Sequence, residues 1–143
     1  QLNIVGDGEN KDNLKDLVNK LKGNKKVKFL GSRNDVLRIL SNTDIFAFST
    51  TVKEGFGIVL IEALSMGIPI IASDVPACRE VLMDGKGGLL ISPENIKIWE
   101  DELTILMESE NKRNLLANKA KKTSKYYDIN LVAKEYLQLL NSI

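Results

Sequence analysis

The stretch EGFGIVLIEALSMGIPIIASD, residues 54–74, decides the predicted fold. Its glycine-containing start lets the backbone turn sharply, and the mostly apolar run that follows predicts a helix beginning at about Gly57. Gly67 marks the end of that helix, and Pro69–Ala72 predicts a buried strand. A loop, helix and strand in this order are typical of a parallel sheet with crossover helices.

The rest of the chain repeats this alternation of short apolar runs and longer amphipathic segments. The alternation predicts a three-layer, Rossmann-like α/β fold with one parallel sheet of about five strands and extra C-terminal helices. Residues 1–143 are interpreted as a single domain. The predicted strands are Leu2–Val5, Val27–Leu30, Asp44–Phe48, Pro69–Ala72 and Gly88–Ile91, and the predicted helices are residues 10–22, 33–41, 57–66, 76–83, 95–108, 111–125 and 129–142.

The segment around Gly57 carries the first functional signal. No Ser, Thr, Asp or Asn stands directly before the predicted helix, so the amides near Gly57, Ile58 and Val59 lack a side-chain cap. An uncapped helix start at the carboxyl edge of a parallel sheet binds anions through its free N–H groups. Gly55 and Phe56 lie in the loop just before it. A phosphate is the expected occupant.

Two glutamates flank this predicted phosphate site. Glu62 lies on an otherwise apolar helix, where a buried carboxylate without a partner is strongly unfavourable, and Glu54 lies in the preceding loop. Because a carboxylate repels phosphate, both acids are better suited to hydroxyls, such as those of the ribose and the second sugar of a nucleotide sugar. An alternative stays open at this point, in which Glu54 is a solvated loop residue and Glu62 points to water.

Composition and charge exclude several classes of function. The 20 basic and 19 acidic side chains give a formal charge of +1, which argues against nucleic-acid binding by bulk charge. The sequence has no histidine, which excludes histidine-based catalysis, and its one cysteine, Cys78, is interpreted as a small packing residue. No apolar run reaches the roughly 18 residues of a membrane span. Because the chain opens with Gln1 and shows no signal peptide, we expect a piece of a longer protein.

Charge is segregated toward the C-terminal end. Residues 94–110 contain six acids and one lysine, whereas residues 111–125 contain six basic side chains and no acid. Two interpretations stay open: a basic face for a membrane surface or an acidic partner, or two solvated helices of complementary charge. Trp99 is interpreted as the anchor of a tail helix.

Several ordered motifs resemble the C-terminal, donor-binding lobe of family 4 glycosyltransferases, the retaining group with the two-lobed GT-B architecture. The family signature is a Glu, seven residues and a second Glu, with Phe-Gly between them. This sequence has Glu54, Phe56-Gly57 and Glu62 in that arrangement. The segments that resemble neighbouring strands of the lobe are residues 4–8 (IVGDG), 27–31 (VKFLG), 69–74 and 88–91.

The resemblance implies a role for each site residue. Glu54 is expected to contact the hydroxyls of the transferred sugar as the catalytic carboxylate, and Glu62 to bind the ribose. The amides at the helix start are expected to hold the diphosphate. The backbone of Leu30 and Gly31 is expected to meet the base, on which Arg33 stacks. The full set of expected donor-binding residues is Leu30, Gly31, Arg33, Gly55, Phe56, Gly57, Ile58, Val59 and Glu62.

The resemblance also implies the substrates and partners. The donor is expected to be a nucleotide sugar, a UDP-sugar being favoured, with no cofactor and no metal. An N-terminal lobe outside this sequence is expected to bind the acceptor, so this chain alone is expected to be inactive. Nucleic acid is not an expected partner. The full-length protein is expected in the cytoplasm, in peripheral contact with the inner membrane surface, where it serves synthesis of cell-surface polysaccharide or glycolipid.

The sequence departs from the family pattern in two places. The loop after the predicted strand Pro69–Ala72 reads DVPACRE, Asp74–Glu80, where many members have a Gly-Gly pair. The lobe's first strand and helix, which carry an Arg and a Lys that grip the diphosphate, lie outside this sequence. That strand is central in the family, so its absence predicts either a closed gap, with strand order 2-1-3-4-5, or self-association through the open strand position.

A different class of function stays open from the sequence. A flavodoxin-like nucleotide-binding or regulatory module without transfer chemistry accounts for the alternation and the phosphate loop. It leaves the paired glutamates unexplained. A nucleotide-sugar epimerase of related fold is a third interpretation, but such enzymes rely on histidines, which this chain lacks.

Overall fold

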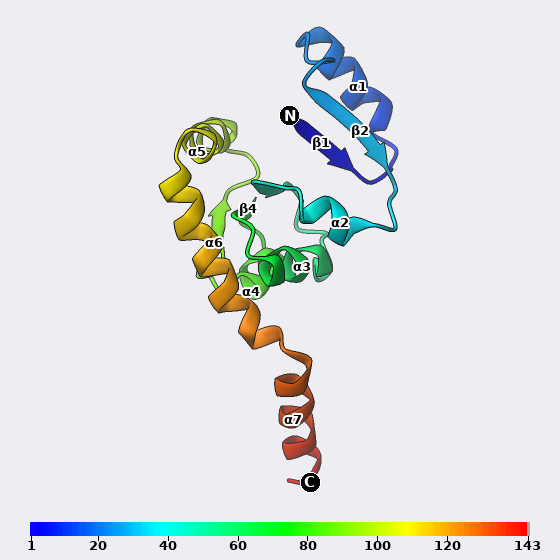
Figure 1. Cartoon of the computed structure of the whole chain (residues 1–143). Coiled ribbons are helices and arrows are strands. Elements are labelled where there is room, and N and C mark those ends of the chain that lie inside the picture. The colour runs from blue at the N-terminus through cyan, green and yellow to red at the C-terminus, as the bar shows by residue number, and fades with distance from the viewer. Residues whose placement is uncertain (143) are drawn as a thin grey trace. The chain divides into compact units, whose positions relative to one another are not determined.

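The computed structural model describes residues 1–142, which divide into two compact units, residues 1–36 and residues from 37 on. The first unit contains one strand–helix–strand motif (Figure 1). Its two strands are parallel, with Leu2 opposite Val27, and the register shifts between Ile4 and Val5. The elements are β1 (Leu2–Val5), α1 (Lys11–Lys20) and β2 (Val27–Gly31).

The second unit holds a three-stranded parallel sheet in the order β3-β4-β5. Helix α2 (Val36–Leu40) starts at the boundary between the units and leads into it. The other elements are β3 (Phe46–Phe48), α3 (Ile58–Met66), β4 (Ile70–Ser73), α4 (Pro76–Val81), β5 (Leu89–Ile91), α5 (Ile96–Glu108), α6 (Glu110–Ser124), the 3-10 helix η1 (Lys125–Tyr127) and α7 (Ile129–Leu140).

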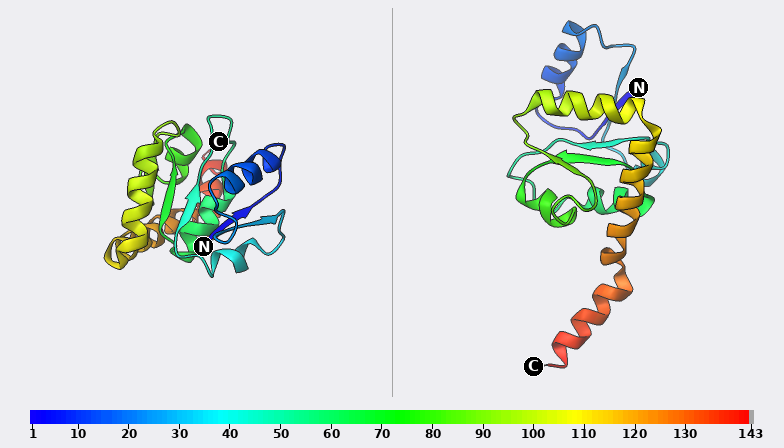
Figure 2. Two further views of the ribbon diagram at one scale, coloured as in Figure 1. Left: turned by 90° about the horizontal axis from the view of Figure 1, so that it is seen from above. Right: turned by 90° about the vertical axis from the view of Figure 1, so that its left-hand side faces the viewer.

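Strand β4 is the centre of the second unit, because all four of its residues are buried. Helix α5 covers one face of the sheet, and α3 and α4 cover the other (Figure 2, right). On the α5 face, Ile71 and Ile91 pack with Leu106 and Leu116, and Trp99 packs against this cluster. Helix α6 contacts α5, β4 and α3 and so joins the two sides of the sheet. The prediction that Trp99 anchors a tail helix is confirmed.

The predicted α/β class with parallel strands is confirmed, as are the C-terminal helices that follow one another without a strand. Each predicted strand and helix coincides with an observed element, and only the ends differ. Helix α7 has no buried residue, although apolar side chains recur along it. Among the helices in residues 1–142, none combines the length and the apolarity that a bilayer crossing requires.

Of the two expectations for the strand gap, closure with the order 2-1-3-4-5 is wrong, and self-association through the open position stays a prediction. Within residues 1–142, β1 pairs only with β2, and β3 pairs only with β4, so the five strands form two sheets. A physical reason is that a β1–β3 pair would gain little stabilisation. It would add only a few hydrogen bonds of about 1 kcal/mol each, and β1, unlike β4, has no buried residue whose packing would support the pair.

Candidate functional site

The carboxyl ends of β3 and β4 are tied together at one edge of the second unit. The backbone N–H of Thr50, in the loop after β3, donates a hydrogen bond to Ser73 Oγ at 2.9 Å. Ser73 is the last residue of β4 and is fully buried. This bond fixes the start of the loop that leads into α3, and it gives a buried hydroxyl the partner it requires.

The loop after β3 holds the Glu54 carboxylate in one place. Thr50 Oγ1 donates to Oε2 of Glu54 at 3.2 Å, and the Gly55 N–H donates to Oε1 at 3.1 Å. The backbone N–H of Glu54 donates to the Thr51 carbonyl at 3.0 Å. The side chain is half-buried. Since both carboxylate oxygens and the backbone are held, Glu54 has the fixed orientation that a substrate-binding group needs.

Helix α3 begins as the sequence predicts, without a side-chain cap. Gly57 is its N-cap residue and adopts the left-handed conformation, with φ of +74°. An added Cβ would lie 3.2 Å from Leu60 Cδ1, so both backbone and space favour glycine here. The first amides of the helix therefore have no capping side chain.

The sequence of α3 is apolar almost all round, which predicts a buried helix, but only part of its surface is buried. Leu60, Ala63 and Leu64 are buried, but Ile58 is 67% exposed. Glu62 is half-buried and lies one turn beyond Ile58, on the same face of the helix. Among the described residues its carboxylate has no hydrogen-bond or ion-pair partner. One face of α3 is thus packed, while the face with Glu62 is open for a ligand.

A third carboxylate, that of Asp74, directly follows β4 and was not predicted as a site residue. Its N–H donates to the Ile91 carbonyl at 2.8 Å, and its Oδ2 accepts from Arg79 Nη2 at 2.7 Å. Arg79 also pairs with Asp84 at 3.5 Å. Asp74 Oδ1 is closed off from solvent, where it contacts Arg79 Nε without accepting a well-formed hydrogen bond. Its position directly after a buried strand was the available sequence signal.

The pKa of the Cys78 thiol is affected by burial and by the negative charges of Glu54 and Asp74. Burial, together with these negative charges, raises the pKa of Cys78 to about 11. Cys78 is fully buried in α4. The prediction that it is a packing residue is therefore confirmed, and the two carboxylates lie on the same side of the second unit, within electrostatic reach of one thiol.

The residues expected to meet the base lie in the first unit. Leu30 and Gly31 end β2, and Gly31 adopts a φ of +65° while its carbonyl accepts a hydrogen bond from Gly6 at 2.8 Å. Arg33 is exposed and binds Asp35 through two hydrogen bonds, of 2.8 and 2.9 Å. This pairing raises the pKa of Arg33 above its ordinary value. Both side chains line an open hollow together with Ser32 and Asn34.

The predicted site residues are divided between the two units. In the second unit, Glu54 lies in the loop that leads into α3, and Glu62 lies on α3 itself. The members of the predicted set found in the second unit are Glu54, Gly55, Phe56, Gly57, Ile58, Val59 and Glu62, and the members found in the first unit are Leu30, Gly31 and Arg33.

Comparison with known proteins defines the family. Residues 1–123 match the family described as "Glycosyl transferases group 1", and the chain belongs to it. An N,N'-diacetylbacillosaminyl-diphospho-undecaprenol alpha-1,3-N-acetylgalactosaminyltransferase from Campylobacter jejuni is 34% identical over 117 residues, 82% of this chain and 31% of that protein. A phosphatidyl-myo-inositol mannosyltransferase from Mycobacterium tuberculosis is 30% identical over 149 residues, 100% of this chain and 39% of that protein.

Solved structures agree with this family. Anabaena Alr3699/HepE in complex with UDP superposes with a TM-score of 0.86 at 26% identity, over 99% of this chain and 40% of that one. WaaG, a glycosyltransferase involved in lipopolysaccharide biosynthesis, has a TM-score of 0.78 at 24% identity, over 90% and 34% of the two chains, and shows the fold alone. The fold is that of the Rossmann-like C-terminal lobe of GT-B glycosyltransferases. The chain spans 31% to 39% of the length of the curated relatives named here.

Proposed function

We propose that this chain is the nucleotide-sugar-binding part of a retaining glycosyltransferase whose other lobe binds the acceptor. One observation carries the proposal: α3 starts without a side-chain cap at Gly57, directly beside a Glu54 carboxylate that is already held in place. The open helix start suits an anion, and the fixed carboxylate suits sugar hydroxyls. A nucleoside diphosphate bound to a sugar contains both.

The helix start is proposed to stabilise the leaving group. The amides of Gly57, Ile58 and Val59 point out of the N-terminal end of α3, where the helix dipole favours negative charge. When the bond to the sugar breaks, negative charge grows on the diphosphate, and preorganised donors are worth most at that moment. Gly55 and Phe56 lie in the same loop, which the hydrogen bonds around Glu54 hold in place.

The two glutamates are proposed to bind hydroxyl groups. Glu54 orients the transferred sugar and offsets positive charge that develops at its anomeric carbon. Glu62 is half-buried and has no hydrogen-bond or ion-pair partner within residues 1–142, and the two hydroxyls of a ribose would supply the missing hydrogen bonds. In the first unit, the backbone of Leu30 and Gly31 is proposed to meet the base, with the planar Arg33 guanidinium stacked on it.

A UDP-sugar is the proposed donor, and the lipid-linked class is the proposed acceptor. Alr3699/HepE was solved in complex with UDP and in complex with UDP-glucose. The Campylobacter and Mycobacterium relatives carry names that specify a diphospho-undecaprenol and a phosphatidyl-myo-inositol substrate. The proposed place of action is therefore the cytoplasmic face of a membrane. Without an acceptor lobe, the chain itself is proposed to bind the donor but not to transfer the sugar.

Nucleotide titration tests this proposal. We expect saturable binding of UDP by calorimetry, stronger than binding of GDP or ADP, and at least about tenfold weaker in a Glu62→Ala variant because two hydroxyl contacts are lost. Glu135→Ala is the matched control, since Glu135 is exposed on α7. In the full-length enzyme, Glu54→Gln should lower the rate of transfer by about a hundredfold or more while UDP binding persists.

Two outcomes would contradict the proposal. One is the absence of nucleoside diphosphate binding by both this chain and the full-length protein. The other is an equal loss of UDP affinity in the Glu62→Ala and Glu135→Ala variants, which would place the nucleotide away from α3.

A further inference from the structure

The exposed face of α6 combines positive charge with apolar side chains. Lys112, Leu115, Lys119, Lys122 and Tyr126 follow one another at intervals of three and four residues, and all five are exposed. This spacing places them along one side of the helix. The chain stays right-handed helical through Ser124 and Lys125, so the row continues into η1. We call these five residues the α6 stripe.

The α6 stripe is not used inside the second unit. The packed side of α6 consists of Leu116, Ala120 and Thr123, which are buried. No stripe lysine forms an ion pair among the described residues, and residues 111–125 contain no acid that could neutralise the charge. The exposed α5 acids Glu100 and Asp101 pair with Lys97 instead. The positive charge of the stripe therefore faces solvent unopposed.

Two basic residues of α6 outside the stripe, Arg113 and Lys121, contact other parts of the second unit. Arg113 donates from Nη1 to the carbonyls of Leu106 and Met107 at 2.7 and 3.1 Å and so satisfies the end of α5. The stem of Lys121 lies over Gly67, where an added Cβ would come within 2.6 Å of Lys121 Cγ. Within residues 1–142, the side chains of the stripe lysines form no hydrogen bond or ion pair.

We propose that the α6 stripe docks on an anionic lipid surface. A lysine near such a surface gains attraction from acidic headgroups, and its long stem lets the charge reach water while apolar neighbours enter the interface. Leu115 is 55% exposed and Tyr126 is 60% exposed. Tyrosine favours the boundary between hydrocarbon and water. A helix that lies flat on a membrane has this alternation of basic and apolar side chains.

The composition of the stripe favours lipid over nucleic acid. Recognition of nucleic-acid phosphates favours arginine, whose planar guanidinium forms two hydrogen bonds at once, whereas all basic residues of the α6 stripe are lysines. The formal charge of the whole chain is only +1, so attraction depends on a local patch that faces an extended anionic surface. The inference does not rest on the proposed function, because it concerns residues outside the donor site.

Vesicle sedimentation tests the proposal. The 143-residue chain is mixed with two kinds of vesicle. One kind consists of phosphatidylcholine alone, and the other contains about 30% phosphatidylglycerol, which gives the surface a negative charge. We expect binding to the anionic vesicles only, weakening as salt is raised. Lys112→Gln/Lys119→Gln/Lys122→Gln should lower the affinity at least about tenfold, because each lysine adds to the attraction.

A matched triple variant controls for net charge. Lys20, Lys25 and Lys26 are exposed in the first unit, so Lys20→Gln/Lys25→Gln/Lys26→Gln removes the same charge elsewhere. It should bind as the unchanged chain does. Leu115→Ser should weaken binding several-fold more than Leu21→Ser, which alters a still more exposed leucine of the first unit.

Four results would overturn the proposal: no binding to anionic vesicles, equal loss in both triple variants, no loss in the stripe variant, or capture by poly(U) RNA through the same lysines without vesicle binding. Circular dichroism of each variant verifies that the helices remain. Because nucleotide titration does not involve the stripe, the outcome of this experiment is separate from that of the donor-site test.

Discussion

The two units of this chain differ in how many of their apolar side chains are buried. Every buried hydrophobic residue among residues 1–142 lies between Leu40 and Ala120, in the second unit. The first unit, residues 1–36, has no fully buried residue, and Leu2, Leu14, Leu17 and Leu21 of its apolar set are exposed. A strand–helix–strand motif of this size is too small to form a core. The same α/β pattern therefore builds a buried core in the second unit only, and we expect that unit to be the more stable of the two.

The largest expected effect compares one leucine from each unit. Leu64 in α3 is fully buried, so Leu64→Ala should lower the free energy of unfolding by about 2–5 kcal/mol through lost contacts and a cavity. Leu17 in α1 is 50% exposed, and Leu17→Ala should cost about 1 kcal/mol or less. Denaturant unfolding, followed by far-ultraviolet circular dichroism, measures both, because each unit contains helix. Equal effects would contradict the difference between the units.

The second prediction uses two glycines that differ in their surroundings. An added Cβ at Gly87 would lie 2.9 Å from Leu64 Cδ2 and 3.0 Å from Thr123 Cγ2, between α3 and α6. Gly87→Ala should therefore lower the stability by about 1–3 kcal/mol. At Gly8 of the first unit nothing lies within 4 Å of the added atom, so Gly8→Ala should leave the stability unchanged or raise it slightly. Thermal unfolding of the two variants distinguishes them.

The sequence is sufficient to predict the elements of both units but not their assembly. Continuous apolar runs such as Ile70–Ala72 and the glycine at position 67 determine the local elements, because burial and backbone freedom act within a few residues. Whether β1 pairs with β3 depends on the few hydrogen bonds such short strands would gain, and hydrophobic pattern contains no information about that balance. The single five-stranded sheet was therefore the part of the fold that was predicted wrongly.

The candidate site was predictable where a local backbone rule applies. The uncapped start of α3 follows from the residues before Gly57 alone. Glu54 could be named, but its anchoring by Thr50 could not, because that contact depends on how the loop folds back. Asp74 and its partner Arg79 were missed since an Asp after a strand is common, and only the structure shows the ion pair that holds it.

The third prediction concerns pH and the buried thiol of the second unit. Burial, with the charges of Glu54 and Asp74, raises the pKa of Cys78 from 9.0 to about 11. Below pH 9 the thiol is protonated in both states; between pH 9 and 11 only the unfolded thiol ionises, so the stability should fall as pH rises. In Cys78→Ala this part of the decline should be absent. A decline of the same slope in both proteins would assign it to other groups, and rapid reaction of Cys78 with a thiol reagent at pH 8 would contradict its burial.

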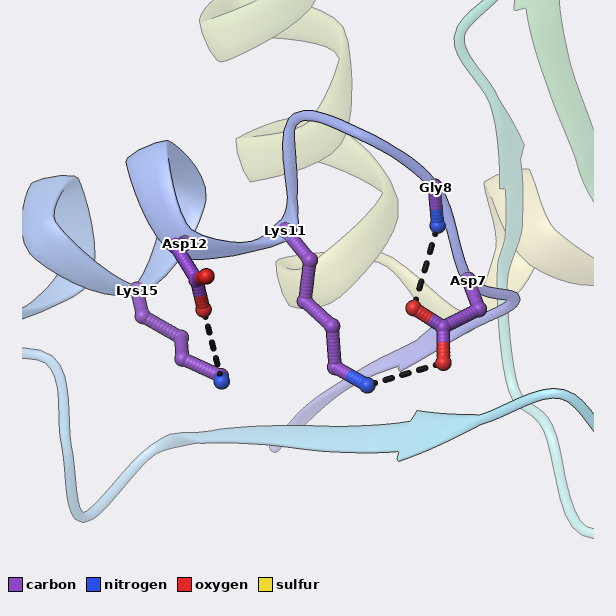
Figure 3. A network of polar contacts seen from close by, with 5 residues as sticks. All are labelled: Asp7, Gly8, Lys11, Asp12 and Lys15. Atoms are coloured by element: carbon purple, nitrogen blue, oxygen red, sulfur yellow. Dashed lines mark hydrogen bonds and ion pairs between the residues drawn. The ribbon is translucent and has the colours of Figure 1, made fainter.

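The smallest effect is expected at an exposed ion pair of the first unit. Lys11 Nζ donates to Asp7 Oδ2 at 2.9 Å and the Gly8 N–H donates to Oδ1 at 3.1 Å, beside a second pair of Asp12 and Lys15 (Figure 3). The hydrogen bond from Lys11 and its positive charge lower the pKa of Asp7 below 3.8, and the hydrogen bond from the Gly8 N–H makes a smaller contribution in the same direction. The contribution of the Asp7–Lys11 pair to the free energy of unfolding is therefore present above pH 3.8 and is lost as pH falls through the lowered pKa of Asp7.

Exposed pairs of this kind contribute little, because water and salt screen them and two mobile side chains must be held. Asp7→Asn should therefore leave the unfolding midpoint at neutral pH unchanged within error, whereas NMR titration of the Asp7 carboxyl in the unchanged chain should give a midpoint below 3.8 that moves back toward 3.8 in Lys11→Gln. Lys15→Gln is the matched control, since Lys15 pairs with Asp12. A large loss of structure in Asp7→Asn would mean that surface charge, rather than burial, holds the first unit together, and the contrast drawn between the two units would fail.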